Sequence, residues 1–518
     1  MAQRALAVSE AAGKCAAAMV AALILLALLA VFSNAEVGSG LGPADWAAIR
    51  FTVVQATLSA MVSVLLAIPV ARALARRRFP GRSVLVTLLG APFILPVIVA
   101  VLGLLAVFGR SGWLNEALVT LGLPSLSIYG LQGVVLAHVF FNLPLSTRLL
   151  LQGWQTIPAE RFRLAAQLSM TPRAVFRTLE WPLLRQVLPG VTALIFVICL
   201  TSFAVALTLG GGPRATTIEL AIYQAFRFDF DLGRAALLSL VQLFLAGGAA
   251  ALALWILPTI SIGGGLDRPL RRWDAHSKLQ RITDTAAILC AAAFLLLPLC
   301  AVVVRGVVGL PQMPAAVWAA AWSSIWVAAL SVMILLALAL PVAGWIASAK
   351  RGSAEAIGLL GLSASPLMIG TGWFILINPL VDPFDVALPV TALVNALMAL
   401  PFVLRVLVPP LRDTIHVYGR LAQTLRLQGW ALWRWVLLPR LRPQIGFAAG
   451  LTGALSVGDL GVIALFADND RVTLPLQMYR LMGAYRMEAA AGAALILLAL
   501  ALGIFWLCDK GGRWHAAP

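Results

Sequence analysis

The sequence predicts an all-α polytopic membrane protein with about twelve transmembrane helices in two fused, parallel six-helix repeats. Three observations lead to this prediction. Hydrophobic residues make up 61% of the 518 residues, charged residues 11%, and the mean hydropathy is +0.95, which is more apolar surface than a soluble fold buries. Long apolar runs recur along the whole chain. One polar segment occurs twice, half a chain apart, as expected of a duplication.

The apolar runs are long enough to cross a bilayer, because a spanning helix needs roughly 20 apolar residues. In the first half the expected spans are 15–33, 50–74, 84–108, 128–152, 186–209 and 234–258. In the second half they are 284–308, 317–348, 356–378, 386–410, 443–466 and 488–508.

The repeats are predicted to occupy residues 1–258 and 284–518. Residues 259–283 form the expected cytoplasmic linker, since three consecutive glycines at 263–265 are followed by mixed charges, a composition typical of junctions between domains. An even number of spans in each half gives both repeats the same orientation.

The formal net charge of +17 suggests a nucleic-acid partner, but the distribution of the charges argues against one. If the N-terminus is cytoplasmic, 29 of the 38 Lys and Arg residues fall on the cytoplasmic side of the predicted topology and 9 on the other. This asymmetry is the positive-inside pattern of membrane proteins. We therefore expect both termini in the cytoplasm, a lipid bilayer around the spans and no nucleic acid.

The sequence contains no pattern typical of an enzyme. It has no G-x-x-x-x-G-K-[ST] loop, so ATP would be hydrolysed by a separate subunit. None of the four histidines has metal-site spacing, and the five cysteines form no C-x-x-C pair. We expect no catalytic residue, no metal site and no cofactor in this chain.

The duplicated segment covers residues 163–185 and 420–442, which share 9 identical residues of 23 at a shift of 257 (420 − 163). Each copy is predicted to form a helix, a turn and a second helix, because leucines at helical spacing are interrupted by Thr171-Pro172 in one copy and Gln428-Gly429 in the other. An isolated amphipathic helix could lie flat in the membrane interface, but this role would not require two matched copies. We expect cytoplasmic loops at 153–185 and 410–442.

This spacing resembles the cytoplasmic EAA loop of binding-protein-dependent ABC importer permeases, in which E-A-A is followed after three residues by Gly and thirteen residues later by the Pro of an L-P pair. The Glu and Gly of that motif are absent from both copies here. The resemblance implies that the matching positions contact two copies of a cytoplasmic ABC ATPase subunit. They are Arg163, Leu164, Ala165, Ser169 and Pro182 in the first copy, and Arg420, Leu421, Ala422, Arg426 and Pro439 in the second.

Residues 201–204, 208–213, 215–224 and 233–238 are similar to the permease subunits of thiamine/thiamine pyrophosphate importers. The resemblance implies a multi-pass permease of the bacterial inner membrane, with ATP and Mg bound by the partner ATPase. A periplasmic binding protein would deliver thiamine or its phosphates. Two alternatives remain open: a ferric-iron ABC importer permease, which shares the architecture, and a twelve-span secondary transporter, which would use an ion gradient.

Polar residues inside the predicted spans are candidates for the translocation path. His138 and Asn395 are equivalent under the shift of 257 (395 − 138), so we expect them to face one another near a pseudo-twofold axis. Asp459 could attract a cationic thiazolium or pair with an arginine. Each polar side chain could instead bond a neighbouring helix. The full candidate set is His138, Asn142, Ser202, Asn395 and Asp459.

The outward loops 210–233 and 467–488 are long enough to receive a soluble binding protein. Charges at the rim of such an interface set orientation and encounter rate more than affinity. The residues expected to dock the binding protein are Arg214, Glu219, Arg227, Asp468 and Arg471.

Overall fold

The computed structural model describes residues 7–36, 38, 40–90, 94–210, 212, 215–256, 277–348, 365–466 and 471–514. All regular structure in these ranges is helical, which confirms the predicted all-α polytopic class. The first half contains α1 (Ala7–Asn34), α2 (Pro43–Arg76), α3 (Arg82–Leu88), α4 (Val97–Phe108), α5 (Trp113–Thr120), α6 (Leu131–Gln155), α7 (Ala159–Gln167), α8 (Pro172–Val175), α9 (Trp181–Leu200), α10 (Ala204–Leu209), α11 (Ile218–Arg227) and α12 (Leu232–Ile256). The second half contains α13 (Lys278–Gly309), α14 (Ala316–Ser348), α16 (Pro366–Ile377), α17 (Ala387–Thr424), α18 (Gly429–Leu432), α19 (Leu438–Val457), α20 (Gly461–Phe466), α21 (Leu474–Gly483) and α22 (Met487–Arg513).

Eleven helical stretches of the described ranges are long and apolar enough to cross a membrane. The ninth predicted span, 356–378, coincides in part with the shorter apolar helix α16. Its first residues lie outside the described part of the chain, as does most of the predicted linker 259–283, so the division into two repeats at these positions stays a prediction.

Three predicted spans are not continuous helices. The span expected at 84–108 is divided into α3 and α4, that at 186–209 into α9 and α10, and that at 443–466 into α19 and α20. Backbone that leaves the helix at membrane depth is tolerated where it is covered by protein or lines a cavity. The breaks meet in space, since a Cβ added to Gly458 would lie 2.9 Å from Cβ of Pro96, so only glycine allows these two segments their close approach.

The first helix of each half packs against the other half. Helix α1 lies against α14 and α16 of the second half, while α13 lies against α2 and α4 of the first half as well as α22 of its own half. Buried side chains of α1 and of the second half form one continuous apolar core. This exchange of helices holds the two halves together, and it leaves the centre of the assembly to be lined by the broken helices.

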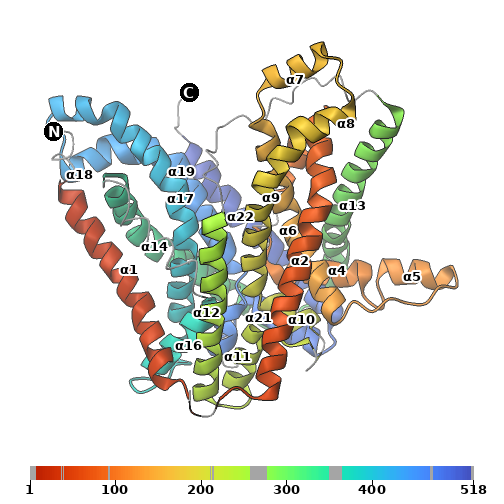
Figure 1. The fold of residues 1–518 in the computed structure, drawn as a ribbon. Helices are drawn as coiled ribbons and strands as arrows, with labels where there is room; N and C mark the ends of the chain where they lie inside the picture. Colours follow the sequence, from red (N-terminus) through yellow and green to blue (C-terminus); the bar gives the residue numbers. More distant parts are fainter. Residues whose placement is uncertain are drawn as a thin grey trace.

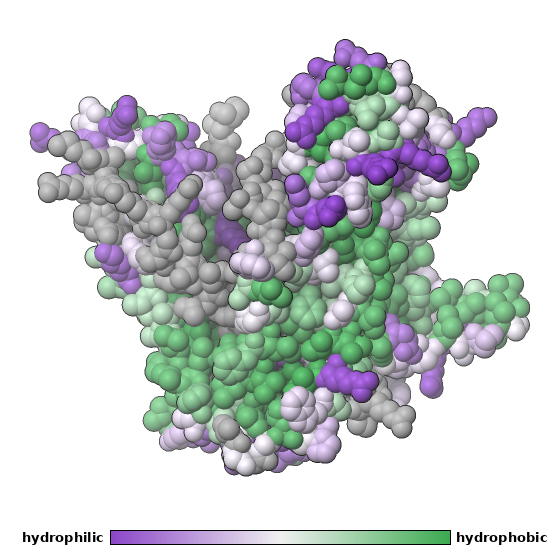
Figure 2. Space-filling view, viewed as in Figure 1, coloured by the Kyte–Doolittle hydropathy of each residue, from purple (hydrophilic) through white to green (hydrophobic). Residues whose placement is uncertain are grey.

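The two ends of the molecule differ in how far their helices spread. Helices α7 and α8 of the first half and α18 of the second lie at the end where α1 begins, and α11 and α16 lie at the opposite end (Figure 1). The helices diverge toward the α7/α18 end and converge toward the α11/α16 end. Figure 2 shows an apolar belt across the middle of this face, with hydrophilic side chains gathered over α7 and α8. A belt of this kind is what lipid chains would cover.

Candidate functional site

A cavity of about 420 Å³ lies between the two halves, where the broken helices meet. Many of its lining residues are pairs related by the shift of 257, so both halves contribute equivalent positions. These pairs are His138 and Asn395, Phe141 and Met398, Asn142 and Ala399, Ile198 and Leu455, Thr201 and Gly458, Ser202 and Asp459, Phe203 and Leu460, and Ala204 and Gly461. All five residues predicted for the translocation path thus line one cavity.

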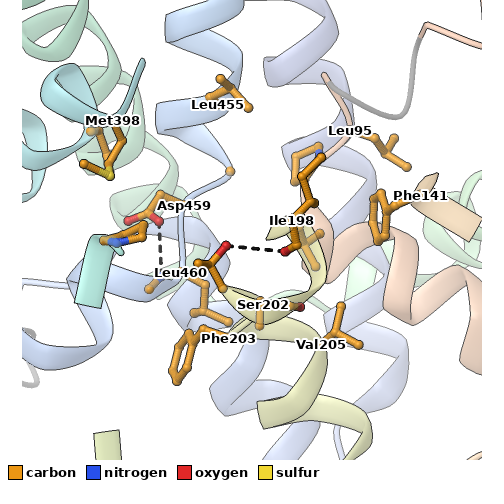
Figure 3. A pocket seen from close by; sticks show the side chains of 18 of the residues that line it. Leu95, Phe141, Ile198, Ser202, Phe203, Val205, Met398, Leu455, Asp459 and Leu460 are labelled. Atoms are coloured by element: carbon orange, nitrogen blue, oxygen red, sulfur yellow. Dashed lines mark hydrogen bonds between the residues drawn. The ribbon is translucent and has the colours of Figure 1, made fainter. Parts of the chain in front are cut away.

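Ser202 and Asp459 occupy the two non-helical breaks, between α9 and α10 and between α19 and α20. Oδ1 of Asp459 accepts the backbone N–H of Gly461 at 3.2 Å, which orients the side chain in the cavity (Figure 3). Its Oδ2 is buried and makes no direct hydrogen bond within the part of the chain that the structure describes. Among the lining residues Asp459 has the only carboxyl group, and none of them is Lys or Arg.

The side chains of His138 and Asn395 are held by neighbouring helices, in a corresponding way in each half. Nδ1 of His138 lies 3.1 Å from Oγ of Ser59. Nδ2 of Asn395 donates to Oγ of Ser456 at 3.0 Å, and Ser456 bonds Ser331 at 2.8 Å. These residues therefore line the cavity and also bond neighbouring helices, so the two alternatives considered from the sequence, a place on the path and a bond between helices, both apply to them.

Aromatic rings fill the space from the cavity toward the α11/α16 end. Phe203 lines the cavity and packs edge-on against Tyr223 of α11, with 5.3 Å between ring centroids. Further along, Phe374 contacts Phe226 at 4.5 Å and Phe466 at 5.5 Å. The first two of these pairs are edge-to-face and the Phe374–Phe466 pair is tilted. The rings come from both halves, and such packing stabilises apolar contacts.

The duplicated segments lie at the opposite end of the molecule and share backbone detail (Figure 1). Ser169 and Arg426, at the motif's glycine positions, have φ of 49° and 52°. The N–H groups of Ser169 and Met170 donate to Ala166 and Ala165 O, each at 3.0 Å, and Arg426 and Leu427 repeat these bonds. This is the Schellman arrangement, which usually has glycine at the left-handed position. Both copies therefore form this turn although neither has glycine at the left-handed position.

We expect the double variant Ser169→Gly, Arg426→Gly to strengthen both turns. A left-handed backbone costs a non-glycine residue roughly 1–2 kcal/mol, and part of the gain is offset by the larger entropy of unfolded glycine, leaving about 1 kcal/mol for each site. Hydrogen exchange of the amides at 168–170 and 425–427 should slow about fivefold. Ser169→Ala, Arg426→Ala is the control and should not slow it. Faster exchange in the glycine variant would contradict this account of the turns.

The exposure of the two segments also matches. Leu164 and Leu421 are 56% and 54% exposed, and the leucines one turn further, Leu168 and Leu425, are 66% and 59% exposed. The alanines at 165 and 422 are buried against the protein, and the arginines at 163 and 420 are exposed. Each segment therefore presents a pair of leucines beside a cation, away from the apolar belt. We call 159–175 and 416–432 the two docking segments.

Each docking segment leads directly into a long membrane helix. A π-helical turn, Phe176–Glu180 or Trp433–Leu437, connects it to α9 or α19. Pro182 and Pro439 lie in the first turns of these helices, where proline is tolerated. Helices α9 and α19 end at the breaks that line the cavity. A docking segment and one wall of the cavity are thus opposite ends of one helix.

The predicted binding-protein contacts have mixed outcomes. Arg227 stacks on the ring of Phe384, 5.8 Å from its centroid, and Arg471 donates to Phe384 O at 2.8 Å and to Asp385 at 2.7 Å, so the two arginines meet at one loop of the α11/α16 end. Arg214 and Asp468 lie outside the described residues. Glu219 was expected at the exposed rim, but it is fully buried because α11 turns its apolar and acidic side chains inward. The structure does not place it at a docking surface.

Burial raises the pKa of the Glu219 carboxyl from 4.5 to about 8, and hydrogen bonds with Ser365 and Gln242 lower it by a smaller amount. Glu219 lies in α11, which is not among the stretches long enough to span the membrane. Between these pH values the folded state keeps a proton that the unfolded state releases, so stability should fall as pH rises toward 8. Glu219→Gln should flatten this dependence in thermal unfolding at pH 5.5, 7 and 8.5. Glu116→Gln, at an exposed site, should not. An unchanged slope in the Glu219 variant would contradict the burial of a protonated carboxyl.

An apolar helical bundle with broken helices around a central cavity, and paired exposed segments at one end, has the architecture expected of a membrane permease. No family model matches the chain. The chain is 42% identical to the thiamine transport system permease protein ThiP of Salmonella typhimurium, with 97% of each chain covered. It is 39% identical to the ThiP protein of Brucella abortus, over 94% of this chain and 92% of that one, and 33% identical to that of Haemophilus influenzae, over 87% and 86%. The chain belongs to the ThiP family of thiamine transport system permease proteins.

Proposed function

We propose that this chain is the membrane subunit of an ATP-driven importer of thiamine and thiamine pyrophosphate in the bacterial inner membrane. A periplasmic binding protein delivers the substrate at the α11/α16 end. Two copies of a cytoplasmic ABC ATPase bind the docking segments at the other end, where both termini lie in the cytoplasm. ATP and Mg are bound by these partners, and the chain itself is a transport subunit.

The observation that carries this proposal is the direct connection from each docking segment to the cavity. Helices α9 and α19 have 20 residues each, so each spans about 30 Å at 1.5 Å per residue. A tilt imposed on the docking segment displaces the Thr201–Phe203 or Gly458–Leu460 break at the far end. A partner drives such a motion only if it contacts the two states of the segment differently, and the exposed leucines and arginines supply contacts that a closing ATPase pair can change.

Within this proposal the cavity is the passage for substrate. Thiamine and its phosphates share a cationic thiazolium ring, and Asp459 offers an oriented carboxylate in a largely apolar cavity. Coulomb attraction is stronger there than in water. Asp459 thus supplies a transient counter-ion, and Phe203, Tyr223 and Phe374 close the path toward the periplasm when the helices diverge at the cytoplasmic end.

The experiment that tests the function compares uptake of labelled thiamine, thiamine pyrophosphate and ferric iron in cells lacking the chain, with and without its restoration. We expect restored uptake of the thiamine compounds only, dependent on the ATPase subunit. Restoration of iron uptake would favour the ferric-iron permease. Thiamine uptake that needs no ATPase but collapses with the ion gradient would favour a secondary transporter.

A further inference from the structure

The two π-helical turns that join the docking segments to α9 and α19 are surrounded by different chemistry. We call these joint one (Phe176–Glu180) and joint two (Trp433–Leu437). Phe176 corresponds to Trp433, and Glu180 to Leu437, at the shift of 257. The sequence of α2 aligns with that of α14 at a shift of 272 residues (344 − 72), so that Arg72 aligns with Gly344.

Equivalent contacts in the two halves support the alignment of α2 with α14. Thr52 and Ser324, also 272 apart, accept the first backbone N–H of α11 and α21, from Ile218 at 2.9 Å and Leu474 at 2.8 Å. Pro69 and Pro341, again 272 apart, lie inside the two continuous helices. Arg72 and Gly344 are therefore structural equivalents.

Joint one is ionic. The side chain of Glu180 is fully buried. Its Oε2 accepts a hydrogen bond from Nε of Arg72 at 2.7 Å, and Nη2 of Arg76 forms an ion pair with the same oxygen at 3.8 Å. The Arg72 guanidinium also lies over the ring of Phe176, 4.6 Å from the centroid. Arg72 thus holds both ends of the π-helical turn to α2.

The ionic contacts extend to the other half of the protein. Asp284, at the start of α13, accepts Nε of Arg77 at 2.8 Å and lies 3.9 Å from Nη1 of Arg76. Arg76 is itself buried. Glu180, Arg76 and Asp284 therefore connect the first docking segment through α2 to α13, which follows the linker in sequence.

Joint two is apolar. Leu437 is buried, and the indole ring of Trp433 occupies the space over Gly344, where an added Cβ would lie 2.7 Å from Cζ2. Leu437 and Gly344, at the positions of Glu180 and Arg72, carry no side-chain charge, so at these described positions the turn meets α14 by shape alone. The one cation of the turn, Arg434, lies over the ring of Trp435. Apolar contact is non-directional, whereas separating a buried ion pair leaves a charge without its partner, at high cost.

We propose that Glu180 is the positioning residue of joint one. Its ion pairs oblige the first docking segment, α2 and α13 to move as a unit, whereas joint two allows the second docking segment to shift against α14. The two docking segments then transmit motion along different helices. The inference rests on the proposed function, because it assumes that an ATPase moves the docking segments.

The test uses the complete permease–ATPase complex in proteoliposomes, supplied with thiamine-loaded binding protein. Two variants are compared with wild type: Glu180→Gln, which keeps the shape of the side chain but removes its charge, and the triple variant Arg72→Gly, Phe176→Trp, Glu180→Leu, which transfers joint two into the first half. The measurements are ATPase subunit recovered with the permease and thiamine imported per ATP hydrolysed. Leu437→Met is the matched control in joint two.

We expect normal ATPase recovery in both variants and at least a fivefold fall in thiamine imported per ATP, with Leu437→Met unchanged. The triple variant separates coupling from stability, because it leaves no carboxylate to be paired at position 180. If Glu180→Gln fails to assemble, the triple variant decides alone. A wild-type ratio in the triple variant, or in Glu180→Gln, would overturn the inference. If wild-type permease itself recovers no ATPase, the proposed function fails instead.

Discussion

Replacing Leu164 and Leu421 together by aspartate is expected to abolish ATPase binding and thiamine uptake. Both leucines are more than half exposed and lie at equivalent positions of the two docking segments, so the substitution leaves the fold intact and acts on the partner surface. Buried apolar anchors in an interface are worth about 2 kcal/mol or more each. Losing two of them, about 4 kcal/mol together, should weaken the complex by several hundredfold or more.

The measurement is the amount of ATPase subunit that co-purifies with the permease at equal expression, together with uptake in cells. Leu279→Asp is the matched control, because Leu279 is 70% exposed at the start of α13, outside the docking segments. We expect the control to retain the ATPase. Full recovery of ATPase with the double leucine variant would remove the docking segments from the interface.

Asp459→Asn is expected to lower thiamine uptake about tenfold at substrate concentrations below saturation. A factor of ten corresponds to about 1.4 kcal/mol, at the lower end of what a hydrogen bond to a charged group contributes. Asparagine keeps an oxygen that can accept the Gly461 N–H, so folding is spared while the negative charge is lost. The measurement is the initial rate of labelled thiamine uptake with ATPase recovery confirmed.

The pseudo-symmetry of the cavity offers a control for this prediction. Ser202→Asp combined with Asp459→Ser moves the carboxylate to the equivalent break in the first half and should restore much of the uptake. If Asp459→Asn transports thiamine at the wild-type rate, the counter-ion role is wrong. If the exchanged variant is as poor as Asp459→Asn, the carboxylate acts only from the second-half break, and the equivalence of the two breaks does not extend to the counter-ion.

The duplication allowed much of this arrangement to be predicted from sequence. A fixed shift of 257 paired His138 with Asn395, and both line the cavity. The same shift identified the docking segments and placed Ser169 and Arg426 at equivalent turns, although neither residue type indicates a left-handed backbone. It also relates Ser202 to Asp459, a pairing not recognised in the sequence because the two residues differ in chemistry.

The broken helices and the buried glutamate could not be predicted in the same way. Thr201, Ser202 and Phe203 interrupt an otherwise apolar run without proline or glycine, so nothing local marks the break; the tertiary packing around the cavity determines it. Glu219 was assigned to the surface because it is charged and follows a glycine-rich stretch. Its neighbours Ile218, Leu220 and Ile222 were the available signal, since an apolar run on both sides of an acid indicates a helix that packs inward.

The central claim is that both docking segments contact the ATPase. Photo-crosslinking from Leu168 and Leu425, each replaced in turn by a photoreactive amino acid in the intact complex, tests this most directly. We expect the ATPase subunit to be captured from both positions with similar yield, and not from the exposed control position Leu121, which directly follows α5, a helix that projects from the side of the bundle (Figure 1). Capture of lipid or of the periplasmic binding protein from either docking segment, with none of the ATPase, would contradict it.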